Sequence, residues 1–293
     1  MTQTVNYASP ADASRHGEYT FHRGTRPLYR FASRIGSSTF AAEPGRYHLY
    51  AGWWCPWSQR AAIQRLLNGL DDVVSVSYVD GRRDGRGWAF REATGADPVN
   101  GFTLLREAYE ATEPGFDGLV SVPVLWDRHA RRIVSNDFAT ISVDLATAFR
   151  EFATPTVDTY PAGLSDEIEK VDRWLGPAVN HGIGRAAKDE DAARRLIAAF
   201  RDLDARLRER RYLLGSSLTE ADVRLWVTLV RYDAGANAHG TIGPRLSTFP
   251  HLWAYARDLY QQPAFQSTTN FASFAAPLAD PGNWSAPAHR VED

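Results

Sequence analysis

The single cysteine of this 293-residue chain, Cys55, is the side chain best suited to nucleophilic or redox chemistry. It lies between a β-type run, 45–53, and a run with helical spacing, 56–70, within the letters WWCPWS. A helix N-terminus carries unpaired amide N–H groups and the positive end of the helix dipole, and both stabilise an anion. Pro56 suits the first helical turn, where its missing N–H costs nothing. We therefore predict that Cys55 is populated as a nucleophilic thiolate at neutral pH.

The chain offers Cys55 no second thiol. Position 58, where a Cys-x-x-Cys pair would have its second member, is Ser58. Any disulfide that Cys55 makes must therefore join it to another molecule, such as a small thiol, which favours monothiol exchange over dithiol redox cycling. The alternative is that Cys55 is only a small buried apolar residue, as free cysteines often are. Its place at a strand-to-helix junction, directly before a proline, favours the reactive interpretation.

The first half of the chain has the pattern of a compact α/β sheet. A strand, a helix and a second strand follow one another closely from residue 45, which predicts two parallel strands joined by a right-handed crossover. After a polar insertion at 80–101 come a helix, two strands and a last helix. The expected strands are 45–53, 73–79, 119–127 and 131–137, and the expected helices are 56–70, 102–111 and 138–149. Pro123 lies inside the third strand and marks an edge, a bulge or a cis bond, because proline cannot donate a ladder hydrogen bond.

Every strong signal beyond about residue 164 is helical, because apolar residues recur with a period near 3.6. Thr219 followed by Asp222 is a capping-box pattern in which Asp replaces Glu or Gln. The helices are expected at 164–183, 189–214, 219–235 and 249–263. The predicted organisation is an N-terminal arm, 1–44, that wraps the body or partly frays, an α/β domain, 45–153, and an all-helical domain with a C-terminal tail, 154–293.

Composition excludes several classes of function. The chain is 44% hydrophobic and 23% charged, with a net charge of −2, so it has no basic character for nucleic acid or an anionic membrane. No apolar run approaches the roughly 20 residues that span a bilayer, and the N-terminus lacks the apolar core of a signal peptide. One cysteine and the absence of a His pair at i, i+4 argue against zinc, and His48 is expected to be a strand residue. We predict a cytoplasmic enzyme or binding protein without a metal, a nucleic-acid partner or a membrane partner.

Several long blocks of the sequence resemble one family. Cys-Pro-Trp-Ser at the first helix start, Val-Pro at the third strand and an all-helical second half are together similar to the glutathione transferase superfamily. More narrowly, the chain resembles the Xi class, the glutathionyl-hydroquinone reductases, from about residue 40 to 265. The blocks are AEPGRYHLYAGWWCPWSQR, GLDDVVSVSYV, GWAF, GFTLLREAYEATEPGFDGLVSVPVLWD, IVSND, LTEADVRLWVTLVRYDA and FPHLWAYARDLYQ.

The resemblance implies a fold, a reaction and partners. The fold is a thioredoxin-like N-terminal domain followed by an all-α C-terminal domain, in a homodimer. Cys55 matches the catalytic cysteine, which attacks the sulfur of a thiol-conjugated hydroquinone, and a second thiol then releases it as a disulfide. The implied partners are therefore a low-molecular-weight thiol, glutathione or another, and an aromatic substrate.

The resemblance also assigns roles to individual residues. Trp88 in GWAF matches the tryptophan of the thiol site. Val122 matches the residue whose backbone pairs with the cysteinyl part of the thiol, and the Val122–Pro123 bond is expected to be cis. Trp53 and Trp54 neighbour the thiol and are predicted to line the acceptor pocket, although core packing around the first strand is the alternative.

The chain departs from the family at the groups that recognise substrates. Leu119-Val120 replaces an Arg-Val pair, so a charged contact is missing at the thiol site. Asp137-Phe138 replaces the Glu-Ser pair that holds the γ-glutamyl end of glutathione. Asp137 can still pair with an ammonium, but Phe138 cannot donate a hydrogen bond to a carboxylate. Three family tyrosines or tyrosine-containing segments are also replaced, at Gly184, in 235–240 and in 271–277.

Three functions follow from these observations. The first is a thiol-dependent reductase of thiol-conjugated hydroquinones that acts through Cys55, with a co-substrate that is glutathione or a thiol without a γ-glutamyl arm, such as mycothiol. The second is an omega-type thioltransferase that removes glutathione from disulfides with the same cysteine. The third is a non-catalytic binding homologue that lost its chemistry along with the tyrosines.

Overall fold

The computed structural model describes residues 5–21, 27–277 and 279–286. The predictions for the ends of the N-terminal arm and of the C-terminal tail, and for 22–26, lie outside the described residues. The chain divides after Pro155 into two compact units, which we call the N-terminal unit and the helical unit and describe separately.

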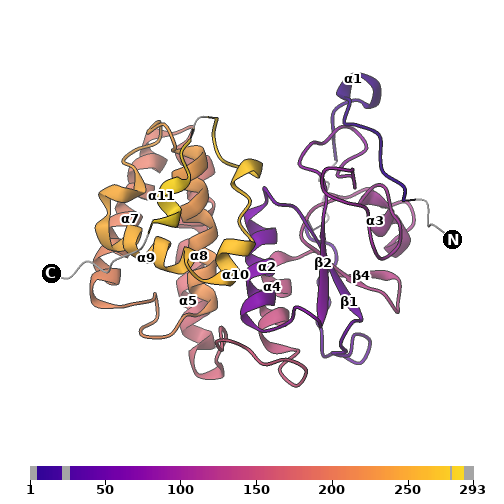
Figure 1. The fold of residues 1–293 in the computed structure, drawn as a ribbon, viewed down its shortest axis with the longest axis horizontal. Helices are drawn as coiled ribbons and strands as arrows, with labels where there is room; N and C mark the ends of the chain where they lie inside the picture. Colours follow the sequence, from indigo (N-terminus) through magenta and orange to yellow (C-terminus); the bar gives the residue numbers. More distant parts are fainter. Residues whose placement is uncertain (1–4, 22–26, 278, 287–293) are drawn as a thin grey trace. The chain divides into compact units, whose positions relative to one another are not determined.

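The N-terminal unit is built on a four-stranded sheet with the order β2-β1-β3-β4 (Figure 1). β1 and β2 are parallel, as the strand-helix-strand pattern predicts, and β3 pairs antiparallel with both β1 and β4. The strands are β1 (Tyr47–Ala51), β2 (Val74–Tyr78), β3 (Val124–Asp127) and β4 (Arg132–Ser135), and the helices are α1 (Ala13–His16), α2 (Pro56–Leu67), α3 (Arg106–Thr112) and α4 (Phe138–Thr147). This arrangement is the predicted thioredoxin-like α/β fold.

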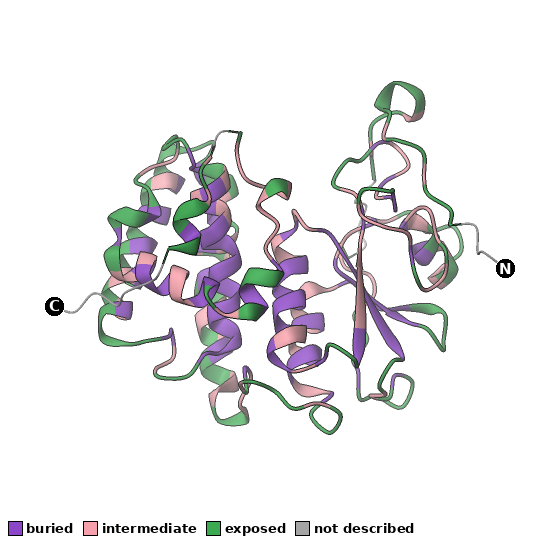
Figure 2. Cartoon of the chain, viewed as in Figure 1, coloured by how far each residue is buried: buried purple, intermediate pink, exposed green. Residues whose placement is uncertain are grey.

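Helices cover both faces of the sheet (Figure 1). Successive residues of a strand point to opposite faces, and β1 follows this rule: Leu49 joins an apolar cluster with Ala61 of α2 and Ile141 of α4, while Tyr50 joins a cluster with Tyr109 of α3. α2 and α4 therefore cover one face and α3 covers the other. Figure 2 shows α2 as mostly buried, and β1 is buried throughout, whereas β2 at the edge of the sheet is mostly of intermediate burial.

Two elements begin four or five residues later than the sequence predicts, because other groups bond the backbone before their starts. β3 begins at Val124 instead of 119, since Pro123 has no N–H for the ladder, and the Val120 N–H bonds to the Tyr19 hydroxyl instead, at 2.9 Å. α3 begins at Arg106 instead of 102, since the Glu107 carboxylate accepts hydrogen bonds from the N–H groups of Thr103 and Leu104.

In the helical unit, two of the expected helices are each interrupted and form two shorter helices. The helix predicted at 164–183 becomes α5, a π-type turn over Gly176–Asn180 that contains Pro177, and α6, because proline cannot continue the hydrogen-bond ladder. The helix predicted at 249–263 ends at Tyr260 and restarts at Pro263. The helices are α5 (Ser165–Leu175), α6 (Gly182–Ala186), α7 (Glu190–Glu209), α8 (Glu220–Arg231), α9 (Pro250–Tyr260), α10 (Pro263–Ser267) and α11 (Gly282–Ser285), with short helical turns at Ala162–Leu164, Gly176–Asn180, Tyr232–Ala236, Leu246–Thr248 and Phe271–Ser273.

α8 is the central helix of this unit and is buried along nearly its whole length (Figure 2). Its predicted capping box is present: the Asp222 carboxylate accepts hydrogen bonds from the N–H and the hydroxyl of Thr219, at 2.8 and 2.9 Å. Asp222 also accepts from the Tyr255 hydroxyl of α9, so the cap ties two helices together. None of the helices in the described part of the chain is long and apolar enough to cross a bilayer.

His48 on β1 is a buried strand residue, as the sequence predicts. Its two ring nitrogens lie 2.7 Å from the Ser75 hydroxyl and 2.8 Å from the Ser77 hydroxyl of β2. Burial, helped by the nearby charges of Arg128 and Arg65, lowers the pKa of His48 to about 3. The imidazole is therefore neutral in the folded protein.

This neutral histidine should make folding sensitive to acid. Between roughly pH 6.5 and pH 3 the unfolded chain protonates His48 and the folded chain does not, so stability is lost as the pH falls, at about 1.4 kcal/mol per pH unit. Urea unfolding at pH 7 and pH 5 should show wild type losing about 2 kcal/mol more than His48→Gln across this interval. Equal losses in the two proteins would contradict the neutral assignment.

Candidate active site

The sulfur of Cys55 lies at the start of α2, where the sequence predicts it. β1 ends at Ala51, the Cys55 N–H closes a turn onto the Gly52 carbonyl at 3.0 Å, and Cys55 is the N-cap of α2 with Pro56 in the first turn. The first turn of α2 contains no acidic residue, so no carboxylate competes for its free N–H groups. The sulfur therefore lies next to the N–H groups of the first turn of α2.

The Cys55 thiol is covered, with 7% of the residue exposed, but it does not belong to either apolar cluster of the N-terminal unit. Its Sγ lies 3.6 Å from the Val122 carbonyl oxygen, in the contact range of an S–H donor. The Val122–Pro123 bond is cis, which confirms the expectation drawn from the family. Cys55 thus contacts the backbone of Val122, the residue that the resemblance assigns to binding the cysteinyl part of a thiol.

Trp53 and Trp54, which directly precede Cys55, belong to two separate groups of aromatic rings. Trp54 packs on Trp88, with ring centroids 4.5 Å apart. The Trp54 ring also covers the backbone of Gly52, where a Cβ atom would lie only 2.7 Å from it, so this position needs glycine. Trp53 instead stacks on Tyr78 of β2 at 3.8 Å. The two tryptophans predicted to line one acceptor pocket therefore have different ring partners, and Trp54 is grouped with the predicted thiol-site residue Trp88.

Leu119 and Val120 contribute less to a thiol site than their place in the sequence suggests. The Val120 side chain is fully buried in the α3-side cluster, and its N–H is bonded to Tyr19. Val120 can therefore offer a ligand little beyond its carbonyl. Leu119 is half-buried and brings no charge.

Asp137 and Phe138 form the N-terminus of α4. One oxygen of the Asp137 carboxylate accepts from the Ala139 N–H at 3.1 Å and the other from the Thr140 hydroxyl at 2.8 Å, so the side chain caps the helix. The Phe138 ring stacks on Trp57 of α2 at 4.4 Å. The ring that replaces the family's serine is therefore packed between the starts of two helices, and it offers no hydrogen-bond donor.

Tyr29 is a site residue that sequence analysis missed. It comes from the N-terminal arm, which has no periodic pattern, and its ring meets Phe138 edge-on at 5.7 Å. Burial, with the charges of Asp137 and Cys55 adding to it, raises the pKa of Tyr29 above its ordinary value. Its phenol is therefore protonated at neutral pH and can donate a hydrogen bond.

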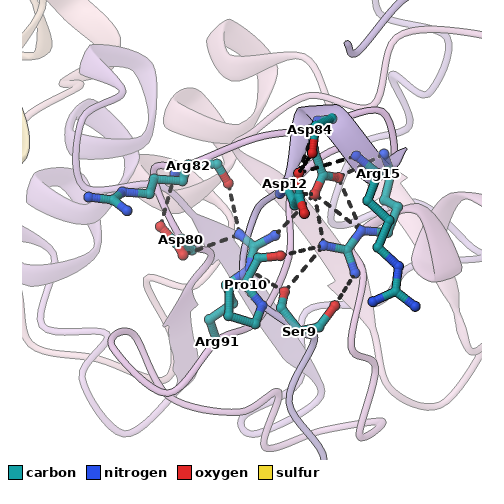
Figure 3. Close-up of polar contacts among 10 residues, drawn as sticks. Ser9, Pro10, Asp12, Arg15, Asp80, Arg82, Asp84 and Arg91 are labelled. Atoms are coloured by element: carbon teal, nitrogen blue, oxygen red, sulfur yellow. Dashed lines mark hydrogen bonds and ion pairs between the residues drawn. The ribbon is translucent and has the colours of Figure 1, made fainter. Parts of the chain in front are cut away.

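The described parts of the arm lie along the N-terminal unit and are clamped to the insertion that carries Trp88 (Figure 3). Arg91 donates to the Ser9 carbonyl at 2.9 Å and to Asp80 at 3.2 Å. The fully buried carboxylate of Asp84 accepts from Arg86 and from the Asp12 N–H at 3.0 Å. Hydrogen bonds from Arg86 hold the pKa of Asp84 well below its usual range, so it is ionised at neutral pH.

No group of three or more His, Cys, Asp and Glu side chains in the described residues is placed to hold a metal ion. The chemistry that these residues can perform themselves is thiol chemistry at Cys55, next to a backbone carbonyl, two packed tryptophans, a helix-capping carboxylate and a tyrosine hydroxyl.

Comparison with known proteins identifies the class. The family model for the glutathione S-transferase C-terminal domain matches residues 185–258. A structure of a glutathione transferase from Gordonia bronchialis has a TM-score of 0.83 and 34% identity over 89% of this chain and 90% of that one. With its thioredoxin-like sheet and helical second unit, the chain is a member of the glutathione transferase superfamily.

Curated relatives narrow the assignment. The chain is 38% identical to the glutathionyl-hydroquinone reductase YqjG of Escherichia coli over 80% of this chain and 75% of that protein. It is 36% identical to the glutathionyl-hydroquinone reductase PcpF of Sphingobium chlorophenolicum over 73% of this chain and 71% of that protein. A Xi-class transferase structure from Natrialba magadii has a TM-score of 0.79 at 34% identity, covering 89% and 86% of the two chains. The chain belongs to the Xi class of glutathione transferases, a family of enzymes.

The contacts of Asp84 and Arg91 with the arm, which we call the clamp, should protect the arm from proteolysis. Asp84→Asn removes the negative charge that accepts hydrogen bonds from Arg86 and from the Asp12 N–H. The arm should therefore detach from the insertion, and trypsin should cut after Arg15 about tenfold faster. Limited proteolysis followed by mass spectrometry measures the rate. Glu18→Gln, an exposed change on the same arm, is the matched control and should cut at the wild-type rate. If the two variants are cut equally fast, the clamp does not hold the arm.

Proposed function

We propose that this enzyme is a thiol-dependent reductase of thiol-conjugated hydroquinones and that Cys55 is its nucleophile. The observation that carries the proposal is the Cys55 sulfur at the N-terminus of α2, 3.6 Å from the Val122 carbonyl. The names of the two curated relatives support the substrate class. We also infer from the family that the enzyme is a cytoplasmic homodimer.

The reaction has two steps, and each balances. In the first, the Cys55 thiolate attacks the sulfur of the conjugate, an S–S bond forms, and the electron pair of the carbon–sulfur bond passes to the ring carbon, which takes a proton. The ring is reduced to the free hydroquinone, and the thiol is held as a mixed disulfide on Cys55. In the second, another thiol molecule attacks the mixed disulfide, leaves as a symmetrical disulfide and returns the Cys55 thiolate. Since Cys55 is the only cysteine of the chain, no internal thiol can intercept this intermediate.

The neighbouring residues have roles that fit these steps. The Val122 backbone would align the cysteinyl part of the conjugate against Cys55. The Tyr29 phenol, which stays protonated, would supply a hydrogen bond to an oxygen or sulfur that gains charge. Asp137 would face the ammonium of a γ-glutamyl group. Because Phe138 has no donor for the carboxylate of that group, a thiol without a γ-glutamyl arm, such as mycothiol, is the alternative co-substrate.

Replacement of the nucleophile tests the proposal. Cys55→Ser should lower the release of free hydroquinone from glutathionyl-hydroquinone by at least about 1,000-fold, because a serine hydroxyl stays protonated here and is a poor nucleophile toward sulfur. Chromatography of the aromatic product measures the rate, and circular dichroism checks that the variant is folded. A variant that retains substantial activity would remove Cys55 from the mechanism.

Removal of glutathione from disulfides is the second candidate, because the chain is also 34% identical to a protein of Schizosaccharomyces pombe named glutathione S-transferase omega-like 2, over 88% of this chain and 87% of that protein. The same two proteins, wild type and Cys55→Ser, assayed on a glutathione mixed disulfide, separate the candidates. The proposal expects the wild type to have the higher kcat/KM with the hydroquinone conjugate.

A labelling experiment tests the non-catalytic alternative. Iodoacetamide at pH 6 should alkylate Cys55 at least several-fold faster than free cysteine, since the N-terminus of α2 favours the thiolate. Mass spectrometry of the intact protein should show one adduct and its rate of formation. A rate no higher than that of free cysteine would support a binding protein that has lost its chemistry.

A further inference from the structure

Arg83 is an exposed charged residue of the insertion, and the proposed mechanism does not use it. Its guanidinium carbon lies 4.3 Å from the centroid of the Tyr19 ring and 4.5 Å from that of Trp88. Within the described part of the chain it is the one guanidinium that contacts two rings in this way. An exposed arginine held between two rings has given up much of the conformational freedom that a solvated side chain would keep.

The two rings that hold Arg83 are themselves anchored. The Tyr19 hydroxyl accepts a hydrogen bond from the Val120 N–H at 2.9 Å, which ties the arm to the segment that precedes β3. Trp88 packs on Trp54, the residue directly before Cys55, at 4.5 Å. Arg83 is therefore separated from the residue next to the reactive sulfur by one aromatic ring.

The backbone on both sides of Arg83 is also held by the clamp (Figure 3). The Arg82 carbonyl accepts from Arg91 at 2.8 Å, and the following residue is the buried Asp84. At Gly85 a Cβ atom would lie 2.0 Å from the His16 carbonyl, so the loop passes too close to the arm for any side chain there. The insertion is built to present Arg83 in one place.

Within residues 5–21, 27–277 and 279–286, this charge has no acidic partner. No carboxylate of the described residues pairs with Arg83, and no described acceptor takes its N–H groups, whereas Arg86 and Arg91 on the same insertion both meet Asp84. Aromatic rings can hold a guanidinium, but they cannot accept its in-plane N–H bonds as carboxylate oxygens do. A preorganised cation with free donors beside the predicted thiol-site tryptophan has the chemistry of a carboxylate anchor.

We propose that Arg83 binds a carboxylate of the thiol co-substrate and so selects a carboxylate-bearing thiol. This inference rests on the proposed function. Glutathione has two carboxylates, and the one on its γ-glutamyl group sits beside an ammonium that suits Asp137. The carboxylate of its glycyl end has no such neighbour and is the partner for Arg83. Mycothiol has no carboxylate, so Arg83 favours glutathione over it.

A pair of unreactive ligands isolates this contact. S-methylglutathione and its glycinamide analogue differ only in the carboxylate at the glycyl end, and neither can react with Cys55. Calorimetry should show wild type binding the acid about tenfold more tightly than the amide, and Arg83→Gln binding the two equally. If Arg83 had only a structural role, Arg83→Gln would weaken the binding of both ligands equally and preserve the ratio of their dissociation constants. That result would overturn the assignment. Arg83→Lys, which keeps the charge, should retain part of the preference.

Arg82→Gln is the matched control, because Arg82 is the exposed neighbour and its side chain has no partner among the described residues. The Arg82→Gln variant should keep the wild-type ratio between the dissociation constants of the amide and the acid. In turnover, Arg83→Gln should raise the KM for glutathione about tenfold with kcat and the alkylation rate of Cys55 unchanged. Tighter binding of mycothiol than of glutathione by wild type would refute the inference.

The outcomes also separate this inference from the proposed function. If wild type reduces the hydroquinone conjugate and Arg83→Gln keeps the wild-type preference for the acid, the role of Arg83 is wrong and the reductase assignment stands. If wild type neither reduces the conjugate nor binds either ligand, the proposed function is wrong, and the inference fails with it.

Discussion

The site depends on where β1 stops. β1 ends at Ala51, the chain turns over Gly52, and α2 starts at Pro56, so the one sulfur able to act as a nucleophile is the N-cap of a twelve-residue helix. The turn is held by the bond from the Gly52 N–H to the Ser58 hydroxyl at 3.1 Å and by the Trp54 ring, which lies over Gly52. A shift of this junction by one residue would move the sulfur away from the helix terminus and from Val122.

Around that junction, the chain replaces dedicated polar contacts with aromatic packing. Phe138 stacks on Trp57, Trp54 packs on Trp88, and Arg83 lies against Trp88 and Tyr19. Ring contacts fix positions without using the hydrogen-bonding capacity of the ligand. In the proposed site, the groups that would recognise a thiol are then few, namely the Val122 backbone, the Asp137 carboxylate and the Arg83 guanidinium. The placement of Arg83 depends on polar contacts between the arm and the insertion.

Much of the secondary structure and of the fold could be predicted from short-range patterns in the sequence. The strand-helix-strand pattern, the helical spacing after Cys55 and the Thr219–Asp222 cap are local features, and the parallel β1–β2 pair, α2 and the capping box agree with them. The family resemblance also predicted the cis bond before Pro123, which the structure contains. Boundaries were less predictable where a distant group takes over a backbone bond, as Tyr19 does at Val120, because the sequence around Val120 contains no trace of that partner.

The sequence by itself determined the candidate nucleophile, the absence of a second thiol, the fold class and the places where family contacts are replaced. These are properties of residue identity and of neighbours within one or two turns of the chain. Only the tertiary structure decided that Trp53 and Trp54 have separate ring partners, that Tyr29 contacts Phe138, and that Arg83 contacts both Tyr19 and Trp88. The arm has no periodicity that predicts where it docks, since its position is set by buried ionic and aromatic contacts with residues some 65 to 110 positions away.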